Sequence, residues 1–282
     1  MSALVDAVPV TTVPLWEHQA EAVRFAAPRP AAMLSMPMGV GKTLTTIAIV
    51  GERGWARTLI LAPKSVVPHW PREFAKFAAY PIRAVALDER KSVAQRVAQA
   101  ELECARAEAA GVPLVLVTNH EAAWRQDMSS FVTKWRPECL VVDESHRGKD
   151  PFGSFSKWLG RMSKLFRQRI GLTGTPAPHS PLDLFAQYRF LDPRIFGHSF
   201  VRFRARYGVM GGFQGKVVVG FQNCDELAEK FRSIAYECAA DVVSLPETVD
   251  VTRTVTMGAK AAKLYGDVSR DFWASVEAGE VT

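Results

Sequence analysis

A glycine-rich turn that ends in Lys42 and Thr43 is the part of this 282-residue sequence with the clearest chemical potential. The segment GVGKT, with Gly39 and Gly41, follows an apolar run and precedes a helical pattern. A turn at that position wraps backbone N–H groups and a helix N-terminus around phosphates. Lys42 is then placed to reach the β and γ phosphates of a nucleotide, and Thr43 offers its hydroxyl to Mg²⁺. The alternative is a glycine-rich turn with an exposed lysine.

The turn departs from the full phosphate-loop pattern at one position. That pattern has a glycine six residues before the lysine, and this chain has Met36 there. The strand-like run before the turn and the helical pattern after it still favour a nucleotide site.

Two acidic residues follow another apolar run, in the segment LVVDESH. Phosphoryl transfer to water needs a carboxylate that binds the metal and a group that orients or deprotonates the water. Asp143 is the candidate metal ligand, and Glu144 is the candidate base. Taken alone, two acids after a strand are as often a solvated turn or a helix N-cap. Together with the turn at Lys42, they indicate a site that hydrolyses ATP with Mg²⁺.

Short runs rich in Val, Ile and Leu recur along the chain, and turn residues and helical patterns separate them. One helical pattern covers residues 92–110, with Arg96 and Glu103 away from its apolar face. The alternation predicts an α/β fold with a doubly wound, mainly parallel sheet. Ligands of such sheets bind beyond the carboxyl ends of the strands, where the glycine turn and the two acids lie. The runs are residues 31–35, 58–62, 82–87, 113–118, 139–144 and 169–174.

These motifs, in this order, resemble the SNF2-type members of helicase superfamily 2 over nearly the whole chain. LWEHQAEAV looks like the Q-motif, PMGVGKT like motif I, TLILAPKSVVPHWPREFAKF like motif Ia, VLVTNHEAAW like motif Ib, VVDESHRGK like motif II and GLTGTPAPHSPLDLFAQYRFLDPRIFG like motif III with the stretch after it. The resemblance implies a RecA-like P-loop NTPase fold, the first of the two lobes of a helicase. The family usually has acidic residues at the places of Met36 and Pro37, and D-E-A-H where this chain has D-E-S-H.

The resemblance also implies roles for individual residues. Gln19 is implied to read adenine. His146 is implied to link the nucleotide site to motif III, with Thr173 and Thr175 as the relay that couples hydrolysis to movement. The residues implied to face the phosphate backbone of a nucleic-acid strand are Pro63, Lys64, Ser65, Asn119, His120, Arg147 and Lys149. Asn119 and His120 replace a Ser-Tyr pair common in the family, and the alternative for the three cations is solvated surface charge.

The later part of the chain lies mostly outside these motifs. Residues 192–220 are aromatic and basic, and we expect an appendage to the sheet whose fold the pattern leaves open. We expect residues 1–245 to form the ATP-binding lobe and residues 246–282 to form a linker and the first elements of a truncated second lobe. A helical pattern from 259 to about 278 carries an apolar stripe that needs a partner. The stripe consists of Leu264, Val268, Phe272 and Val276.

Aromatic residues at helical spacing have two interpretations. We expect Trp70 and Phe74, four residues apart after motif Ia, to lie in the core rather than to stack on bases. A second group suits nucleic acid and equally suits a helix with a buried aromatic stripe. It consists of Phe200, Phe203 and Tyr207, interleaved with Arg202, Arg204 and Arg206.

Composition and charge agree with this interpretation. The sequence has a net charge of +6, 48% hydrophobic residues and four cysteines that lack metal-binding spacing. The positive charge is weak support for a polyanionic partner. The N-terminus lacks the basic and apolar regions of a secretion signal, and no run of about eighteen apolar residues occurs. We therefore expect no membrane partner and a cytosolic protein, of a prokaryote or of a phage in its host.

The expected function is the ATP-binding lobe of a DNA-dependent ATPase that moves along duplex DNA through backbone contacts without sequence specificity. The resemblance places the transition-state arginines in a second RecA-like lobe, supplied in cis or in trans. We therefore expect the chain alone to bind Mg-ATP weakly and to hydrolyse it slowly, and we expect a cut sequence or a split gene. The alternatives are a strand-separating helicase, the motor of a restriction or repair assembly, and a non-catalytic nucleotide-dependent module that regulates a partner.

Overall fold

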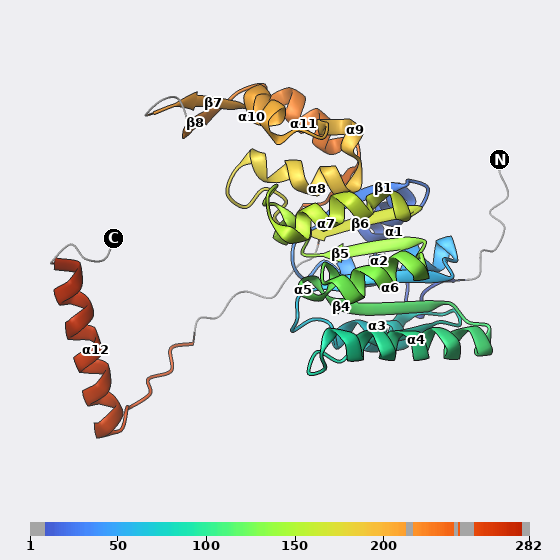
Figure 1. Ribbon diagram of the computed structural model, residues 1–282, viewed down its shortest axis with the longest axis horizontal. Helices are drawn as coiled ribbons and strands as arrows, with labels where there is room; N and C mark the ends of the chain where they lie inside the picture. Colours follow the sequence, from blue (N-terminus) through green and yellow to red (C-terminus); the bar gives the residue numbers. More distant parts are fainter. Residues whose placement is uncertain (1–8, 213–216, 240–241, 243–250, 278–282) are drawn as a thin grey trace. The chain divides into compact units, whose positions relative to one another are not determined.

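The computed structural model describes residues 9–212, 217–239, 242 and 251–277, with the backbone alone for residues 271–277. The chain divides into two compact units, Met1–Val243 and Ser244–Thr282. The first unit contains the sheet and the candidate site, and the second contains one long helix (Figure 1).

The first unit is built on a seven-stranded sheet in which every neighbouring pair of strands is parallel (Figure 1). The strand order is β3-β4-β2-β5-β6-β1-β9. Each of the six predicted apolar runs forms a strand, and no strand end differs from the predicted end by more than one residue, so the predicted α/β fold is confirmed. The strands are β1 (Ala31–Ser35), β2 (Arg57–Ala62), β3 (Arg83–Ala86), β4 (Leu114–Asn119), β5 (Cys139–Asp143), β6 (Gln168–Thr173) and β9 (Ala235–Glu237).

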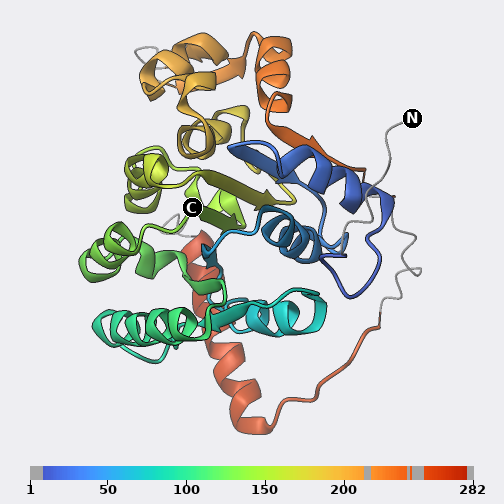
Figure 2. The same ribbon diagram turned by 90° about the vertical axis from the view of Figure 1, so that its right-hand side faces the viewer.

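Helices cover both faces of the sheet, as Figure 2 shows. Alternate residues of a strand point to opposite faces. Leu34 and Ile60 accordingly join one buried cluster, and their neighbours Met33 and Leu59 join the other. The first face carries α1 (Glu17–Ala26), α2 (Lys42–Arg53) and α3 (His69–Phe77); the second carries α4 (Val93–Ala110), α6 (Gln126–Trp135), α7 (Ser154–Met162) and α8 (Leu184–Leu191). Short elements at strand ends are α5 (His120–Ala123) and the 3-10 turns Ser145–Gly148, Ser163–Leu165 and Pro181–Asp183.

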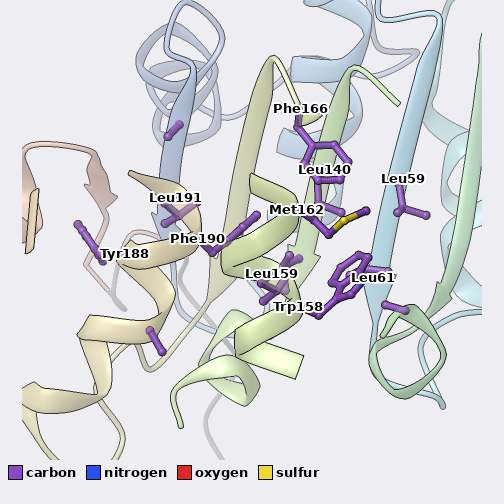
Figure 3. Packing of buried hydrophobic residues seen from close by; sticks show 14 of the residues in the cluster. Leu59, Leu61, Leu140, Trp158, Leu159, Met162, Phe166, Tyr188, Phe190 and Leu191 are labelled. Carbon is purple, nitrogen blue, oxygen red and sulfur yellow. The ribbon is translucent and has the colours of Figure 1, made fainter. Parts of the chain in front are cut away.

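The core of the second face is visible in Figure 3, where Trp158, Leu159 and Met162 of α7 approach leucines of β2 and β5. Positions 158, 159 and 162 lie on one side of a helix because four residues make about one turn. Trp158 is completely buried. Truncation of such a residue to alanine costs about 3–5 kcal/mol of stability, so α7 is firmly fixed to the sheet.

Residues 192–220, which were predicted to form an appendage, form short elements, and the chain after them returns to the sheet as β9. Phe203 and Tyr207 are buried in the same cluster as α7 and α8, so the buried aromatic stripe is the interpretation that the structure supports. The guanidinium of Arg206 pairs instead with Glu226 at the surface. The elements are α9 (Pro193–Phe196), α10 (Phe200–Tyr207), the antiparallel hairpin β7 (Gly208–Gly211) and β8 (Val217–Phe221), α11 (Cys224–Arg232) and β9.

One expectation for α4 is wrong. Arg96 and Glu103 were expected to face away from the apolar side of this helix, and both are buried. Arg96 donates to the Asn119 side chain at 2.7 Å, and Glu103 accepts from Arg106 at 2.7 Å and pairs with Arg83. Burial of these charges is possible because each has oppositely charged or polar partners.

The second unit contains α12 (Ala259–Glu277), as the helical pattern predicted. Within this unit Leu264 and Val268 are 67% and 60% exposed. The side chains of Phe272 and Val276 lie outside the described residues. In the part of the chain that the structure describes, no helix is both long enough and apolar enough to span a bilayer.

Candidate functional site

A cavity of about 690 Å³ lies where the glycine turn, the end of β5 and one side of α3 meet. It brings together every residue that the sequence analysis assigned to nucleotide, metal or water: Gln19, Gly39, Gly41, Lys42, Thr43, Asp143 and Glu144. The lining combines apolar side chains, among them those of Val13, Trp16 and Phe77, with the ammonium of Lys42 and the carboxylates of three acids, Glu73, Asp143 and Glu144. A mostly apolar lining with a few charged groups suits a ligand that has a base and phosphates.

The glycine turn has the geometry of a phosphate-binding loop. The backbone N–H of Met36, the residue after β1, still donates to the carbonyl of Thr173 in β6 at 3.0 Å, so the turn begins directly at the end of the sheet pairing. Gly39 and Gly41 then have φ angles of +83° and +91°, which side chains with a Cβ rarely adopt. Gly41 is the N-cap of α2, so the free N–H groups of the helix start at this turn.

Lys42 lies across the turn. Its ammonium donates to the carbonyl of Met36 at 2.9 Å and to that of Pro37 at 3.0 Å. Carbonyl partners hold the ammonium in place without neutralising it, so its positive charge remains available to a phosphate. The Met36 side chain is fully buried in the core of the first face and does not line the cavity. Met36, which replaces the glycine of the full phosphate-loop pattern, therefore packs in the core and does not face the bound phosphates.

Asp143 and Glu144 form an acidic pair, and no lysine or arginine in the described part of the chain makes an ion pair with either. Burial, reinforced by the negative charge of Glu144, raises the pKa of Asp143 to about 6. Asp143 is the last residue of β5, and Glu144 follows with a φ of +49°. A divalent cation at this place would relieve the unfavourable negative charge. No group of three His, Cys, Asp or Glu side chains that could hold a metal ion occurs among the described residues. An ion here would take oxygens from Thr43, phosphate and water beside the carboxylate, a ligand set that suits Mg²⁺.

Two buried residues that sequence reasoning did not assign to the site support Asp143. The indole N–H of Trp70 donates to Asp143 Oδ2 at 3.3 Å, and His120 Nε2 donates to the Asp143 carbonyl at 2.7 Å. Trp70 was expected only in the core, where it does lie. The apolar spacing of α3 predicts its burial, but nothing in the spacing shows which acceptor its N–H reaches.

Gln19 lies under the turn. Its amide donates to the Val40 carbonyl at 3.1 Å and accepts from the Trp16 backbone N–H at 3.0 Å. His18 Nε2 donates to the same Val40 carbonyl at 2.9 Å, so α1 is tied to the turn by two side chains. Gln19 therefore fixes the position of the turn, and its amide still lines the cavity.

The three residues assigned to coupling are in contact. His146 Nδ1 lies 2.9 Å from Thr173 Oγ1 and 3.2 Å from Glu144 Oε2. The Thr175 backbone N–H donates to Thr173 Oγ1 at 3.1 Å. Burial lowers the pKa of His146, so its ring is neutral near pH 7. A continuous set of polar contacts thus runs from Glu144 to the end of β6.

The residues assigned to nucleic acid fall into two groups. Lys64, Ser65 and Arg147 are exposed and Lys149 is half-buried, all after the carboxyl ends of β2 and β5. Asn119, by contrast, is only 7% exposed, and its amide is engaged by Arg96 at 2.7 Å and Glu121 at 2.8 Å. Pro63 and His120 are buried as well. Asn119, Pro63 and His120 therefore do not present their side chains to a strand in this structure.

Comparisons with known proteins show which family the chain resembles. A protein-family model described as SNF2-related domain matches residues 18–281. The probable ATP-dependent DNA helicase CHR23 of Arabidopsis thaliana is 34% identical over 176 residues, which are 60% of this chain and 15% of that protein. The ISWI chromatin-remodeling complex ATPase ISW2 of Saccharomyces cerevisiae is 32% identical over 174 residues, 59% of this chain and 14% of that protein. The chain thus spans about 15% of the length of these relatives.

A solved structure gives the same fold. The SWI2/SNF2 ATPase core of Sulfolobus solfataricus, solved in complex with dsDNA, superposes with a TM-score of 0.63 and 23% identity. The match covers 82% of this chain and 46% of that chain. At this identity the match establishes the arrangement of strands and helices.

Proposed function

Since residues 18–281 match the SNF2-related domain, this chain belongs to that family, and we propose that it is the ATP-binding lobe of a motor that moves on duplex DNA. The observation that carries the proposal is the meeting of Lys42, Thr43, Asp143 and Glu144 at one cavity. Strand separation, and service in a restriction or repair assembly, are alternatives without a structural observation of their own.

Bound Mg-ATP would supply the phosphoanhydride bond and the metal charge, and the residues of the chain would bind, orient and accept a proton. The N–H groups at the start of α2 and the Lys42 ammonium would hold the phosphate oxygens. Thr43 and Asp143 would hold the magnesium ion through oxygen, the ligand that this ion prefers. Glu144 would orient the attacking water and accept its proton.

Coupling to movement is the finer part of the proposal. The contacts from Glu144 through His146 to Thr173 and Thr175 support a route from the nucleotide to the end of β6. Lys64, Ser65, Arg147 and Lys149 would contact the backbone of one strand, because exposed cations grip phosphates without reading sequence. We assign Asn119 to this surface only indirectly, through its contacts with Arg96 and Glu121.

A complementary lobe, in cis or in trans, would complete the site. Lys42 is the only cation among the residues that line the described cavity. In phosphoryl-transfer enzymes with an assigned arginine finger, that arginine contributes roughly 10³- to 10⁵-fold in rate, and we propose that a second lobe supplies one here. Residues up to 245 would then form the first lobe, and residues 246–282 would form the linker and the first elements of the second. The four free cysteines suit a reducing cytoplasm.

The test is ATP turnover with and without duplex DNA for the chain and for Glu144→Gln. We expect slow turnover, lowered further by about 10²- to 10⁴-fold in the variant, with Mg-nucleotide binding retained. Glu101→Gln, on the exposed side of α4, is the matched control and should change neither quantity. Equal turnover in Glu144→Gln would contradict the assignment of the base. Fast DNA-stimulated turnover by the chain alone would contradict the need for a second lobe.

A further inference from the structure

A second cavity, of about 590 Å³, lies between α7 and α8 on the second face of the sheet, and we call it the α7–α8 pocket. It shares no lining residue with the nucleotide cavity, whose phosphate turn leads into a helix of the first face. Two of its lining residues, Trp124 and Arg189, lie in the segments that resemble motifs Ib and III, but none of the roles assigned to those motifs uses them. The lining residues are Trp124, Ser154, Lys157, Gly160, Arg161, Arg189 and His198.

The lining is basic and contains no acidic residue. Lys157 and Arg161 are exposed and stand four residues apart on α7, which corresponds to a rise of about 6 Å. Like charges at this spacing slightly destabilise a helix, so their pairing does not serve the stability of α7. Lys157, Arg161, Arg189 and His198 form no ion pair within the described part of the chain.

Arg189 is a half-buried cation with incomplete compensation. Its guanidinium donates to the Pro151 carbonyl at 3.0 Å and lies 5.5 Å from the centre of the Phe185 ring. Its Nε is buried and has no hydrogen-bond partner among the described residues. Burial lowers the pKa of Arg189, and Asp150 is the nearest source of opposing negative charge. A terminal nitrogen also lies 3.5 Å from Ser156 Oγ, and because Nε is buried, the terminal nitrogens are the part of Arg189 that could meet an anion in the pocket.

Gly160 explains how Arg189 reaches the pocket. A Cβ at Gly160 would lie 3.2 Å from Arg189 Nε, closer than a side chain normally approaches. A glycine inside a helix costs about 1 kcal/mol relative to alanine. The missing side chain lets Arg189 pack against α7 at Gly160, so α7 gives up helix stability for this contact.

We infer that the α7–α8 pocket binds backbone phosphates of duplex DNA, as a second contact surface on the face of the sheet opposite α2. The inference rests on the proposed function, since it assumes a DNA partner. Three cations and a histidine on α7, α8 and the turn before α10 would face successive phosphates. The cations come from two helices, and Lys157 and Arg161 are exposed, which suits a strand better than a single small anion.

The test is the salt dependence of duplex binding by the chain, measured by fluorescence anisotropy, for Lys157→Gln combined with Arg161→Gln. The slope of log affinity against log salt concentration should fall by about 1.8, at about 0.9 per phosphate contact. Arg72→Gln combined with Lys76→Gln is the matched control, because this pair is also exposed and four residues apart on a helix. The control should leave the slope unchanged although it removes the same charge. Mg-nucleotide affinity should be equal in all three proteins.

The outcomes separate the inference from the proposed function. An unchanged slope in the pocket variant, or an equal fall in the control, would overturn the assignment of the α7–α8 pocket to DNA. Duplex binding by the wild type would in that case still support the proposed motor function. Failure of the wild type to bind duplex at all would overturn both. Binding of inorganic phosphate that the pocket variant loses, with an unchanged DNA slope, would identify a small-anion site and overturn the backbone assignment.

Discussion

Both faces of the sheet have a buried tryptophan in their core, but the two indole N–H groups have different acceptors. On the first face Trp70 is buried and its indole N–H reaches Asp143 at 3.3 Å. On the second face Trp158 is equally buried, and its indole N–H reaches Ser129 Oγ at 2.9 Å, on α6. The core of the first face therefore extends to the acid of the nucleotide cavity, whereas the core of the second face does not. Burial alone thus fails to separate a structural tryptophan from one that supports a site; the acceptor of its N–H does.

The largest expected effect is on the first face. Lys42→Ala should lower ATP turnover by roughly 10²- to 10³-fold, the cost of removing one donor to a reacting group. Circular dichroism should show an unchanged fold, because the lysine holds only two carbonyls of its own turn. Arg161→Ala, on the second face, should leave turnover without DNA unchanged. Comparable losses in both variants would remove the functional distinction between the faces.

The two tryptophans provide a matched comparison. Trp70→Phe should weaken Mg²⁺-dependent nucleotide binding by about 10- to 100-fold, because a hydrogen bond to a charged group contributes about 1.5–3 kcal/mol. Trp158→Phe removes the same indole and should leave that binding unchanged. Urea denaturation measures the stability lost in each protein, so a loss of binding in proportion to stability in both variants would contradict a specific role for Trp70.

Substitution of Asn119, the last residue of β4, tests whether this side chain stabilises the fold or contacts DNA. Asn119→Ala leaves Arg96 without its side-chain acceptor and should lower the free energy of unfolding by about 1–3 kcal/mol. The salt dependence of duplex binding should stay the same, because the amide is buried. A variant with normal stability and a weaker salt dependence would mean that Asn119 contacts phosphate directly.

Substitution of Lys64 should have the smallest effect, and the opposite one to Asn119→Ala: stability should stay the same and the salt dependence of duplex binding should change. It is exposed after β2, so Lys64→Gln should change stability by no more than about 0.5 kcal/mol. The slope of log affinity for duplex against log salt concentration should fall by about 0.9. An unchanged slope would identify Lys64 as ordinary solvated charge.

Much of the fold could be predicted from the sequence because parallel strands buried on both sides must be apolar throughout. That requirement marks residues 31–35 and 139–144 without any alignment. β9 has only three residues, Ala235–Glu237, and so short a run cannot be separated from the end of a helix. The fold of residues 192–220 could not be decided for a related reason, since the aromatic stripe of α10 fits a buried helix and a nucleic-acid surface equally well.

The candidate site could be predicted only where function follows from local spacing. The turn at Lys42 and the acids after β5 are each contained in a few consecutive residues. The support of Asp143 by Trp70 depends on how α3 packs, 73 positions away in sequence. The burial of Asn119 depends in the same way on Arg96, 23 positions away. Contacts between distant positions leave no periodic pattern, so such residues appear only in the folded structure.

The central claim is that Asp143 and the turn at Lys42 form one site for a nucleotide and its metal on the first face. The most direct test is equilibrium binding of a fluorescent ATP analogue, with and without Mg²⁺, to the chain and to Asp143→Asn, whose amide can still accept from Trp70. We predict that Mg²⁺ strengthens binding to the wild type and has no effect on the variant. The same strengthening by Mg²⁺ in both proteins would contradict the claim.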